Sequence, residues 1–352
     1  MAAVSEEGRL EQHTTRPYAE VSKGYSYFER GDLLIAKITP CFENGKATLT
    51  EHLSEQTGFG STEFHVLRPG PKLDAKYLFY LLWNERFRQS AAKGMTGSAG
   101  QKRVPVDLLR RTEIRLPLLE EQRRIAAILE RADALRQKRK RAIALLDSLT
   151  QSIFLEMFGD PLHNPKIIRA RPVRDVCTLL NGAAFKPSDW KEDGHPIIRI
   201  QNLNDSSKPF NRTTRTLNPR LWIRPGDYLF SWSGTPGTSF GCFKWQGPEG
   251  WLNQHIFKVG LVDDVLGSLF LHQMNIRMHE LIAKAHGGVG LQHVTKGMIE
   301  EVEFLCPSID DQRRFADAVE KVDTVNAMHH ASLAQIEALF ASLQHRAFSG
   351  QL

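Results

Sequence analysis

The chain has 352 residues, 41% of them hydrophobic and 24% charged, a composition typical of globular proteins and unlike that of disordered or fibrous chains. Its length exceeds one ordinary core and predicts two or three domains. A net charge of +6 permits an anionic partner such as nucleic acid.

No stretch of the sequence is suited to crossing a membrane. The apolar runs fall far short of the ~20 residues that a membrane helix needs, and the opening MAAVSEEGRLEQHTTRP has no apolar segment typical of an export signal. The cysteines have no close spacing, so they predict neither a disulfide framework nor a zinc site. We therefore expect a cytoplasmic protein with no membrane partner. The cysteines are Cys41, Cys177, Cys242 and Cys306.

Residues 1–116 predict a first domain of mixed α/β type. GDLLIAKI, GKATLTEHL and STEFHVLRP are short runs rich in β-branched and aromatic residues, typical of strands. The later loop MTGSAGQKR (95–103) combines glycines with side chains that can read base edges or neutralise phosphates. An ordinary solvated loop is the alternative for each residue. The candidate DNA-binding residues are Ser98, Gln101, Lys102, Arg103 and the lysine beside Ile38, Lys37.

Residues 117–159 predict one long helix. From Leu119 to about Met157 the apolar residues recur every three or four positions, without proline or glycine, until Gly159. This stripe thins at RQKRKR (136–141). At 1.5 Å per residue the helix would be roughly 55–60 Å long.

Residues 160–306 predict a second, mostly β domain. HPIIRIQNL, GDYLFSW and GCFKW have the composition of strands. SWSGTPGTSFGCFKW (231–245) places hydroxyls beside aromatics, and HGGVGLQH (286–293) resembles the glycine-rich loop of the first domain. The candidate DNA-binding residues of this domain are Ser231, Ser233, Thr235, Gln292, His293 and Lys296.

Residues 307–352 predict a second long helix, from Ser308 to about Phe348. Ser308 can cap the first amides, and Asp311 occupies the position of a capping-box acid. Two long amphipathic helices in one chain most simply pair as an antiparallel coiled coil, with outer faces free for partner helices. The candidate interface residues are Gln122, Arg123, Ile125, Leu129, Gln312, Arg313 and Phe315.

The two halves of the chain resemble each other at a constant offset. EEQRR (120–124) and DDQRR (310–314) begin a gapless match at an offset of 190 that continues for about forty positions. Two unrelated helices with good N-termini would explain the acids but not the register. The loops match too, because Gly97, Gly100 and Val104 meet residues 287, 290 and 294 as Gly, Gly and Val. The sequence therefore predicts a pseudo-twofold internal duplication of an α/β domain followed by a long helix.

The first domain is predicted to be shortened at its N-terminus. Only 30 residues precede the Gly31–Asp32 pair, whereas 65 residues separate the matching Gly226 from the start of the second domain at Pro161. The first domain is thus expected to lack about 35 residues that the second domain has.

Catalytic signatures are absent from the sequence. We find no GxxxxGK[ST] phosphate loop, no Asn-Pro-Pro-aromatic methyltransferase motif, no Asp…Glu-x-Lys nuclease set and no assembled Ser/His/Asp triad. The glycine clusters at 58–60 and 287–290 lack the strand–loop–helix context of a nucleotide site and favour turns. We therefore expect neither catalysis, nor a metal, nor a cofactor in this chain.

With these features the chain resembles the DNA-specificity subunits of type I restriction–modification systems. The segment LPLLEEQRRIAAILERADALRQKRKRAIALLDSLTQSIFLEMFGDP is similar to the central region of that family, and ITPCFENGKA and GSTEFHVLRP are similar to parts of its first target-recognition domain. The resemblance extends over essentially the whole chain.

The resemblance implies a non-catalytic role in host defence. Each target-recognition domain would read one half of a bipartite site in double-stranded DNA, while the two antiparallel helices hold the domains apart. Two methyltransferase subunits, which use S-adenosylmethionine, and motor–nuclease restriction subunits, which use ATP and Mg, would be the partners. The domains would be 1–116, 117–159, 160–306 and 307–352. The alternative is a helical scaffold that binds only proteins through degenerate target domains.

Overall fold

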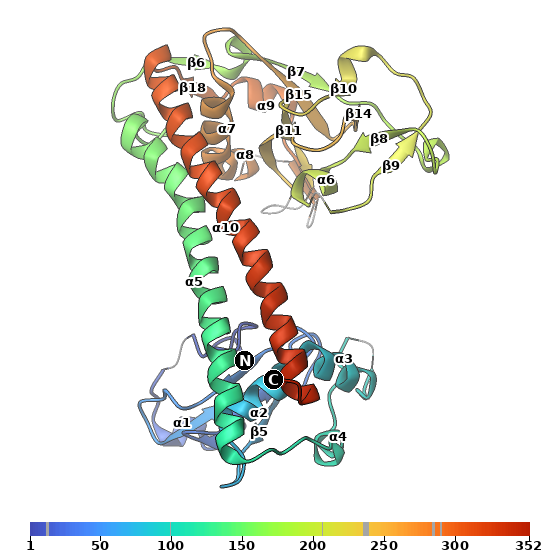
Figure 1. The fold of residues 1–352 in the computed structure, drawn as a ribbon. Helices are drawn as coiled ribbons and strands as arrows, with labels where there is room; N and C mark the ends of the chain where they lie inside the picture. The colour runs from blue at the N-terminus through green and yellow to red at the C-terminus, as the bar shows by residue number, and fades with distance from the viewer. Residues whose placement is uncertain (12–13, 99, 206, 235–238, 284–285, 289–290) are drawn as a thin grey trace. The chain divides into compact units, whose positions relative to one another are not determined.

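The computed structural model describes the chain except for residues 12–13, 99, 206, 235–238, 284–285 and 289–290. It divides into two compact units, unit 1 (Met1–Arg141 with His330–Leu352) and unit 2 (Ala142–His329). Each unit combines short strands and helices with parts of two long helices, α5 (Leu119–Phe158) and α10 (Ile309–Ser349) (Figure 1). The predicted mixed α/β class and both long helices are confirmed.

Unit 1 contains the first domain, whose described strands form two antiparallel sheets. One has the order β3-β2-β5 and the other pairs β1 with β4. The three strand runs expected here are β2, β3 and β5. The bounds are α1 (Tyr18–Val21), β1 (Ser26–Glu29), β2 (Leu33–Ala36), β3 (Ala47–Leu49), β4 (Thr57–Gly60), β5 (Phe64–Leu67), α2 (Ala75–Trp83), α3 (Glu85–Lys93) and α4 (Val106–Arg111).

The core of unit 1 lies on both faces of the β2 sheet. On one face, Leu33 and Ile35 pack with α2 and with the parts of α5 and α10 that belong to this unit. On the other face, Leu34 and Ala36 pack with Phe28, Phe64 and the N-terminal Val4. The alternation of the buried β2 side chains between two clusters follows from the two-residue period of a strand.

Unit 2 contains the second domain, with a larger set of strands. Its described sheets have the orders β10-β14-β8-β9, β13-β11-β15-β7, β12-β17-β16 and β18-β6. The bounds are β6 (Ala170–Pro172), η1 (Val173–Asp175), β7 (Cys177–Asn181), η2 (Pro187–Asp189), β8 (His195–Ile198), α6 (Ile200–Asn204), β9 (Asn211–Thr213), η3 (Pro219–Leu221), β10 (Trp222–Ile223), β11 (Tyr228–Ser231), β12 (Ser233–Gly234), β13 (Gly241–Lys244), β14 (Gly250–Leu252), β15 (Ile256–Leu261), α7 (Gly267–Ile276), α8 (Met278–Ala283), β16 (His286–Gly288), β17 (Leu291–His293), α9 (Lys296–Glu300) and β18 (Glu303–Leu305).

The expected strand HPIIRIQNL is only half correct, because β8 ends at Ile198 and α6 begins at Ile200. The Asn202 side chain accepts a hydrogen bond from the Arg199 N–H at 3.2 Å and donates one to Lys208 O at 3.1 Å. These local bonds turn the chain into a helix where the apolar spacing alone suggested a longer strand.

The long helices begin and end as their sequences predict. Ser308 Oγ accepts a hydrogen bond from the Asp311 N–H at 3.2 Å and contacts the Asp311 carboxylate at 2.6 Å, so the predicted cap of α10 is present. After the helices, Gly159 and Gly350 have φ values of +79° and +78°, the left-handed conformation that glycine adopts without steric cost.

In each unit the parts of α5 and α10 that belong to it contact each other and run antiparallel. In unit 1 the Arg136 guanidinium lies 4.5 Å from the Phe340 ring centroid, and Lys140 Nζ lies 3.6 Å from Glu337. In unit 2 the Phe154 and Phe315 rings lie 5.7 Å apart, and Asn326 donates to Asp147 at 2.7 Å. As the residue number rises along α5, the number of its contact on α10 falls.

The thinning of the α5 stripe at RQKRKR has a structural reason. Gln137 and Lys140 both bind the carboxylate of Glu7, the latter at 2.6 Å. Arg136 packs its guanidinium over Phe340. This turn of the helix therefore contacts the N-terminal segment through polar groups rather than through leucines. Among the described residues no helix is long and apolar enough to cross a membrane.

Candidate nucleic-acid interface

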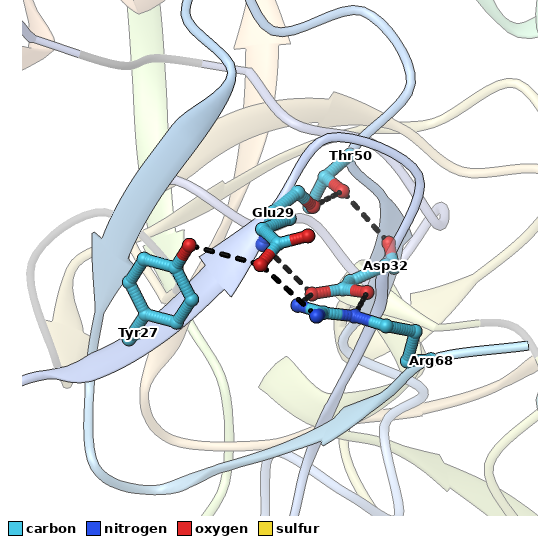
Figure 2. Close-up of polar contacts among 5 residues, drawn as sticks. All are labelled: Tyr27, Glu29, Asp32, Thr50 and Arg68. Atoms are coloured by element: carbon cyan, nitrogen blue, oxygen red, sulfur yellow. Dashed lines mark hydrogen bonds and ion pairs between the residues drawn. The ribbon is translucent and has the colours of Figure 1, made fainter.

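A Gly–Asp turn fixes the start of the middle strand of the first domain (Figure 2). Gly31 has a φ of +96°, and the Asp32 carboxylate accepts a hydrogen bond from the Glu29 N–H at 2.7 Å. Arg68 donates to both oxygens of Asp32 at 2.8 Å and lies 3.0 Å from Glu29. The hydroxyl of Thr50 lies 2.7 Å from Glu29 O and 2.9 Å from Asp32 O. This bidentate pair with Arg68 holds the pKa of Asp32 below its ordinary value.

The second domain has the same turn with a different cation. Gly226 has a φ of +97°, and Asp227 accepts from the Arg224 N–H at 2.8 Å. Lys258 of β15 donates to Asp227 at 2.8 Å and to Trp222 O at 2.9 Å. In both domains, therefore, a Gly–Asp turn comes directly before the strand that leads to the candidate loop. This strand is β2 in the first domain and β11 in the second.

The first candidate loop is a tight hairpin against the end of β2. Thr96 and Arg103 exchange two backbone hydrogen bonds of 3.0 and 2.8 Å, and the Val104 N–H donates to Lys37 O at 2.8 Å. Gly97 has a φ of +125°, and a Cβ there would lie 2.9 Å from Gln101 O, so the turn requires glycine. Ser98, Gln101 and Lys102 project into solvent at the tip.

Arg103 is held by the protein itself. Its Nε and one terminal nitrogen each donate to the Glu63 carboxylate at 2.9 Å, and the other terminal nitrogen donates to Gln101 O at 3.0 Å. The pair lowers the pKa of Glu63. The guanidinium thus supports the loop, and its partner could not be recognised from the sequence because it lies 40 residues away. Lys37 is half-buried beside this pair and also lowers the pKa of Glu63.

The second candidate loop is built on the same plan. β12 pairs with β17, bringing Ser233 opposite His293 and Gly234 opposite Gln292. The Val294 N–H donates to Trp232 O at 3.0 Å, as Val104 does to Lys37. The structure therefore brings together two candidate stretches that lie about 60 positions apart in the sequence. Thr235 lies outside the described residues.

The remaining candidates of the second domain differ in exposure. Ser231 is fully buried in β11 and donates its hydroxyl hydrogen to Ser239 O, and Ser233 is also buried. Lys296 is exposed in the first turn of α9, with its Nζ 3.5 Å from Glu300. Lys296 is thus available to an anion in the way that Ser231 is not.

Gln122 joins the first turn of α5 to the loop before α2. Its side-chain oxygen accepts from the Asp74 N–H at 2.8 Å, and its amide nitrogen donates to Lys72 O at 3.0 Å and Pro117 O at 2.9 Å. The side chain is completely buried. Three backbone groups therefore depend on one glutamine.

Gln312 makes the same three hydrogen bonds at the start of α10. Its oxygen accepts from the Leu266 N–H at 2.9 Å, and its nitrogen donates to Asp264 O at 3.0 Å and Pro307 O at 3.1 Å. We call the two residues the glutamine clamps. Sequence reasoning assigned these glutamines to partner binding. Both glutamines follow a proline by five residues and lie 190 positions apart, but this repetition does not show which backbone groups they bind.

The other helix candidates divide by exposure. Ile125, Leu129 and Phe315 are buried in the cores of their own units. Arg123 and Arg313 keep two thirds of their side chains exposed, at 4.0 Å from Asp74 and 3.1 Å from Asp310 respectively. The exposed arginines are the members of this set that a partner could reach.

Exposed aromatic side chains add surface that the sequence search did not single out. Tyr18 and Tyr27 both lie edge-on to Phe59, with centroids 5.7 and 5.6 Å away. In the second domain Arg199 lies 5.6 Å from the Trp190 ring centroid. Such rings and cations suit stacking on bases or sugars. Among the described residues no group of three or more His, Cys, Asp or Glu side chains could hold a metal ion.

Each unit of the chain combines short strands and helices with parts of the two long helices α5 and α10. The family model described as type I restriction modification DNA specificity domain matches residues 6–145 and 168–338, so the chain belongs to this family.

Curated relatives carry the corresponding names. The chain is 46% identical over 111 residues to the type I restriction enzyme EcoAI specificity subunit of Escherichia coli, a match that spans 31% of this chain and 19% of that protein. It is 22% identical over 306 residues to the MjaVIII specificity subunit of Methanocaldococcus jannaschii, which covers 80% of this chain and 71% of that protein. The chain thus spans about a fifth of the length of the E. coli relative.

A solved structure shares the fold. It is described as the structural basis underlying complex assembly and conformational transition of the type I R-M system, and it matches 100% of this chain and 90% of its own chain. The TM-score is 0.59 and the sequence identity 20%.

Proposed function

We propose that the chain is the DNA-specificity subunit of a type I restriction–modification complex and reads a bipartite site in double-stranded DNA without catalysing a reaction itself. The observation that carries this proposal is the common plan of the two candidate loops. In each domain the residue after the middle strand accepts a hydrogen bond from the valine that ends the loop, at 2.8 and 3.0 Å. Each domain therefore presents one polar loop in the same position, which suits one half-site per domain.

The proposal includes an internal duplication with boundaries at 1–116, 117–159, 160–306 and 307–352. The glutamine clamps support it, because Gln122 and Gln312 bind corresponding backbone groups. The Gly–Asp turns support it as well, with φ values of +96° and +97°. The family model also matches two segments of the chain. A duplicated chain would present two half-sites and two docking surfaces of similar geometry.

Within the loops we assign different roles to different residues. Gln101 and Lys102 are exposed at the tip of the first loop, and Gln292, His293 and Lys296 belong to the second. Glutamine can bind adenine through two hydrogen bonds, whereas lysine neutralises phosphate. Arg103 donates to the Glu63 carboxylate and to Gln101 O, and it therefore stabilises the first loop. Loss of Gln101 should therefore alter the sequence read, and loss of Lys102 should weaken binding to every sequence.

The partners in this proposal are two methyltransferase subunits and, through them, the motor–nuclease subunits, in the cytoplasm. They would supply S-adenosylmethionine, ATP and Mg, for which the sequence of this chain holds no motif. The exposed Arg123 and Arg313 at the starts of α5 and α10 are the side chains we assign to helix-mediated docking.

The test is a map of methylated adenines in cells carrying the chain and its partner subunits. A bipartite motif whose halves change separately on substitution of Gln101 and Gln292 supports the proposal. The protein-binding scaffold is the rival, and it predicts no DNA retention in filter binding with or without the methyltransferase. A motif that is unchanged by both substitutions would contradict the assignment of the loops.

A further inference from the structure

A cavity of about 380 Å³ lies in unit 2, between α7 and the parts of the two long helices that belong to this unit. Leu146, Ile276 and Val322 form apolar parts of its wall. Its acidic members are Asp147 of α5 and Asp323 of α10, and the described residues that line it include no lysine or arginine. Because two carboxylates line one space without a basic side chain, the cavity is suited to a cation.

Buried oxygen atoms without partners belong to the same lining. Thr150 is only 6% exposed, and its hydroxyl forms no hydrogen bond with any described residue. Asn326 donates its amide nitrogen to Asp147 at 2.7 Å, which leaves its buried Oδ1 without a partner among the described residues. Since a buried polar atom without a hydrogen bond is costly, these oxygens indicate a ligand that carries N–H donors.

The titratable groups of the cavity lack a compensating charge. Burial lowers the pKa of His272 to about 4, so its imidazole is neutral at neutral pH and offers an acceptor nitrogen. Asp323 forms no hydrogen bond or ion pair with a described residue, and partial burial raises the pKa of its carboxyl although Lys244 acts in the opposite direction. A cation beside Asp323 would supply the compensation that Lys244 provides only in part.

In unit 1 the corresponding place is filled by side chains of the chain itself. Arg136 donates to Asp133 at 2.8 Å, and the two side chains keep only 12% and 11% of their surface exposed. The same guanidinium lies 4.5 Å from the Phe340 ring centroid and 5.8 Å from that of Trp83. A carboxylate, a guanidinium and two aromatic rings therefore pack together there.

In unit 2 the carboxylate is kept, but the guanidinium and the rings are not. At the offset of 190, the counterparts of the acid, the arginine and the phenylalanine are Asp323, Asn326 and Thr150. Counted from the N–H groups that bind the glutamine clamps, Asn275 corresponds to Trp83, and both of its polar atoms are bound to the backbone of β13. The smaller side chains all line the cavity. This correspondence rests on the proposed internal duplication.

We propose that the cavity of unit 2 binds a guanidinium group on an aliphatic chain, which pairs with Asp323 as Arg136 pairs with Asp133 in unit 1. The aliphatic chain contacts the apolar wall, and the N–H groups of the ligand donate to the hydroxyl of Thr150. A second cationic group on the same ligand would lie near Asp147. The site does not depend on the proposed reading of DNA.

The test uses the full chain and agmatine, a guanidinium joined to an ammonium by a short methylene chain, in isothermal titration calorimetry. We expect saturable binding that butylurea, a neutral analogue of the guanidinium end, does not show at the same concentration. Asp323→Asn should weaken the binding about tenfold, because it removes the charge from the ion pair. Asp317→Asn is the matched control, since Asp317 is an exposed acid of α10 outside the cavity, and it should leave the affinity unchanged.

The same guanidinium could come from a free small molecule or from an arginine side chain of another protein. A short peptide with one central arginine distinguishes the two sources. Weaker binding of the peptide than of agmatine supports a free small molecule, and tighter binding of the peptide supports an arginine side chain in the same site.

A second variant lets the chain fill the cavity itself. Asn326→Arg restores the guanidinium that unit 1 has at the corresponding position, so it should abolish agmatine binding. It should also raise the thermal midpoint of the chain toward that of the agmatine-bound chain.

The absence of saturable binding of either guanidinium probe at millimolar concentration would overturn the proposal, because the cavity would then hold water alone. An affinity that is unchanged in Asp323→Asn or in Asn326→Arg would overturn it as well. The readout is binding of the probe by the chain alone, so its result is independent of the methylation map that tests the proposed function.

Discussion

In the two domains, different parts of the chain cover the face of the sheet that points away from the long helices. In the second domain, Leu229 of β11 faces a cluster completed by Ile198 of β8 and by residues of α6. In the first domain, the corresponding face of β2 at Leu34 is covered by Val4 from the N-terminal segment. Val4 is only 2% exposed, so this segment belongs to the core.

The two faces of the sheet differ in how far they agree between the domains. The helix-facing side of the sheet, with the glutamine clamp and the Gly–Asp turn, is the same in both domains. The outer side is covered by residues of β8 and α6 in one domain and by Met1, Val4 and Leu10 of the N-terminal segment in the other. The strand that leads to the candidate loop is therefore packed on both faces in each domain, β2 by two clusters and β11 by two others.

The largest expected effect breaks the common part of the comparison. Gln122→Ala and Gln312→Ala each remove three hydrogen bonds and leave backbone groups buried without partners. Each should lower the free energy of unfolding by roughly 3–4 kcal/mol, and the two values should agree within about 0.5 kcal/mol. Urea unfolding measures both, with the exposed Gln151→Ala as a control expected to change little. Unequal decreases in the free energy of unfolding would show that the two glutamines contribute differently to stability.

Much of this architecture could be predicted from the sequence, and the features that could not be predicted have a shared cause. Apolar spacing identified α5 and α10 to within one or two residues, and Ser308 was correctly read as a cap. These signals are local. The roles of Arg103 and Gln122 depend on Glu63 and Lys72, which lie 40 and 50 residues away, so no local pattern reveals them.

Burial and pairing also required the structure. Ser231 is a candidate for DNA binding because hydroxyls surround it in sequence, and only the structure shows that it lies in an inner strand of a four-stranded sheet and is fully buried. The pairing of β12 with β17 joins residues 233 and 293, a long-range contact that composition cannot predict. The sequence showed a glycine at position 97, but its positive φ in a hairpin turn is known only from the structure.

The next prediction concerns the residues that cover the outer face of each sheet, Ile198 in the second domain and Val4 in the first. Ile198→Ala should cost about 3 kcal/mol, because the side chain is fully buried in a regular strand. Val4→Ala should cost about 1–2 kcal/mol, since it removes fewer methyl groups and a terminal segment can detach alone. Hydrogen exchange should show faster exchange confined to residues near β1 and β2 in the Val4 variant. Global destabilisation equal to that of Ile198→Ala would contradict the distinction.

A smaller effect is expected on DNA binding when corresponding residues of the two candidate loops are substituted. Gln101→Ala and Gln292→Ala should each lose ~1–3 kcal/mol of discrimination at one position of their own half-site. Lys102→Ala and Lys296→Ala should weaken binding to all sequences and reduce the salt slope by about one. Methylation maps and salt-dependent filter binding measure the two effects. If first-loop substitutions blur the half-site assigned to the second domain, the domains do not read independently.

The smallest expected effect concerns the cation at the Gly–Asp turn, which is Arg68 in one domain and Lys258 in the other. Because Arg68 holds the folded-state pKa of Asp32 below its ordinary 3.8, the contribution of Asp32 to stability is complete above that value. It is lost as the pH falls through the depressed folded-state pKa. Asp32→Asn should therefore flatten the loss of stability below about pH 4, seen in urea midpoints between pH 5 and pH 2. Arg68→Lys, which copies the second domain, should retain part of the effect because one donor replaces a bidentate fork. An unchanged acid limb in Asp32→Asn would show that the pair with Arg68 fixes geometry without contributing to stability through its charge.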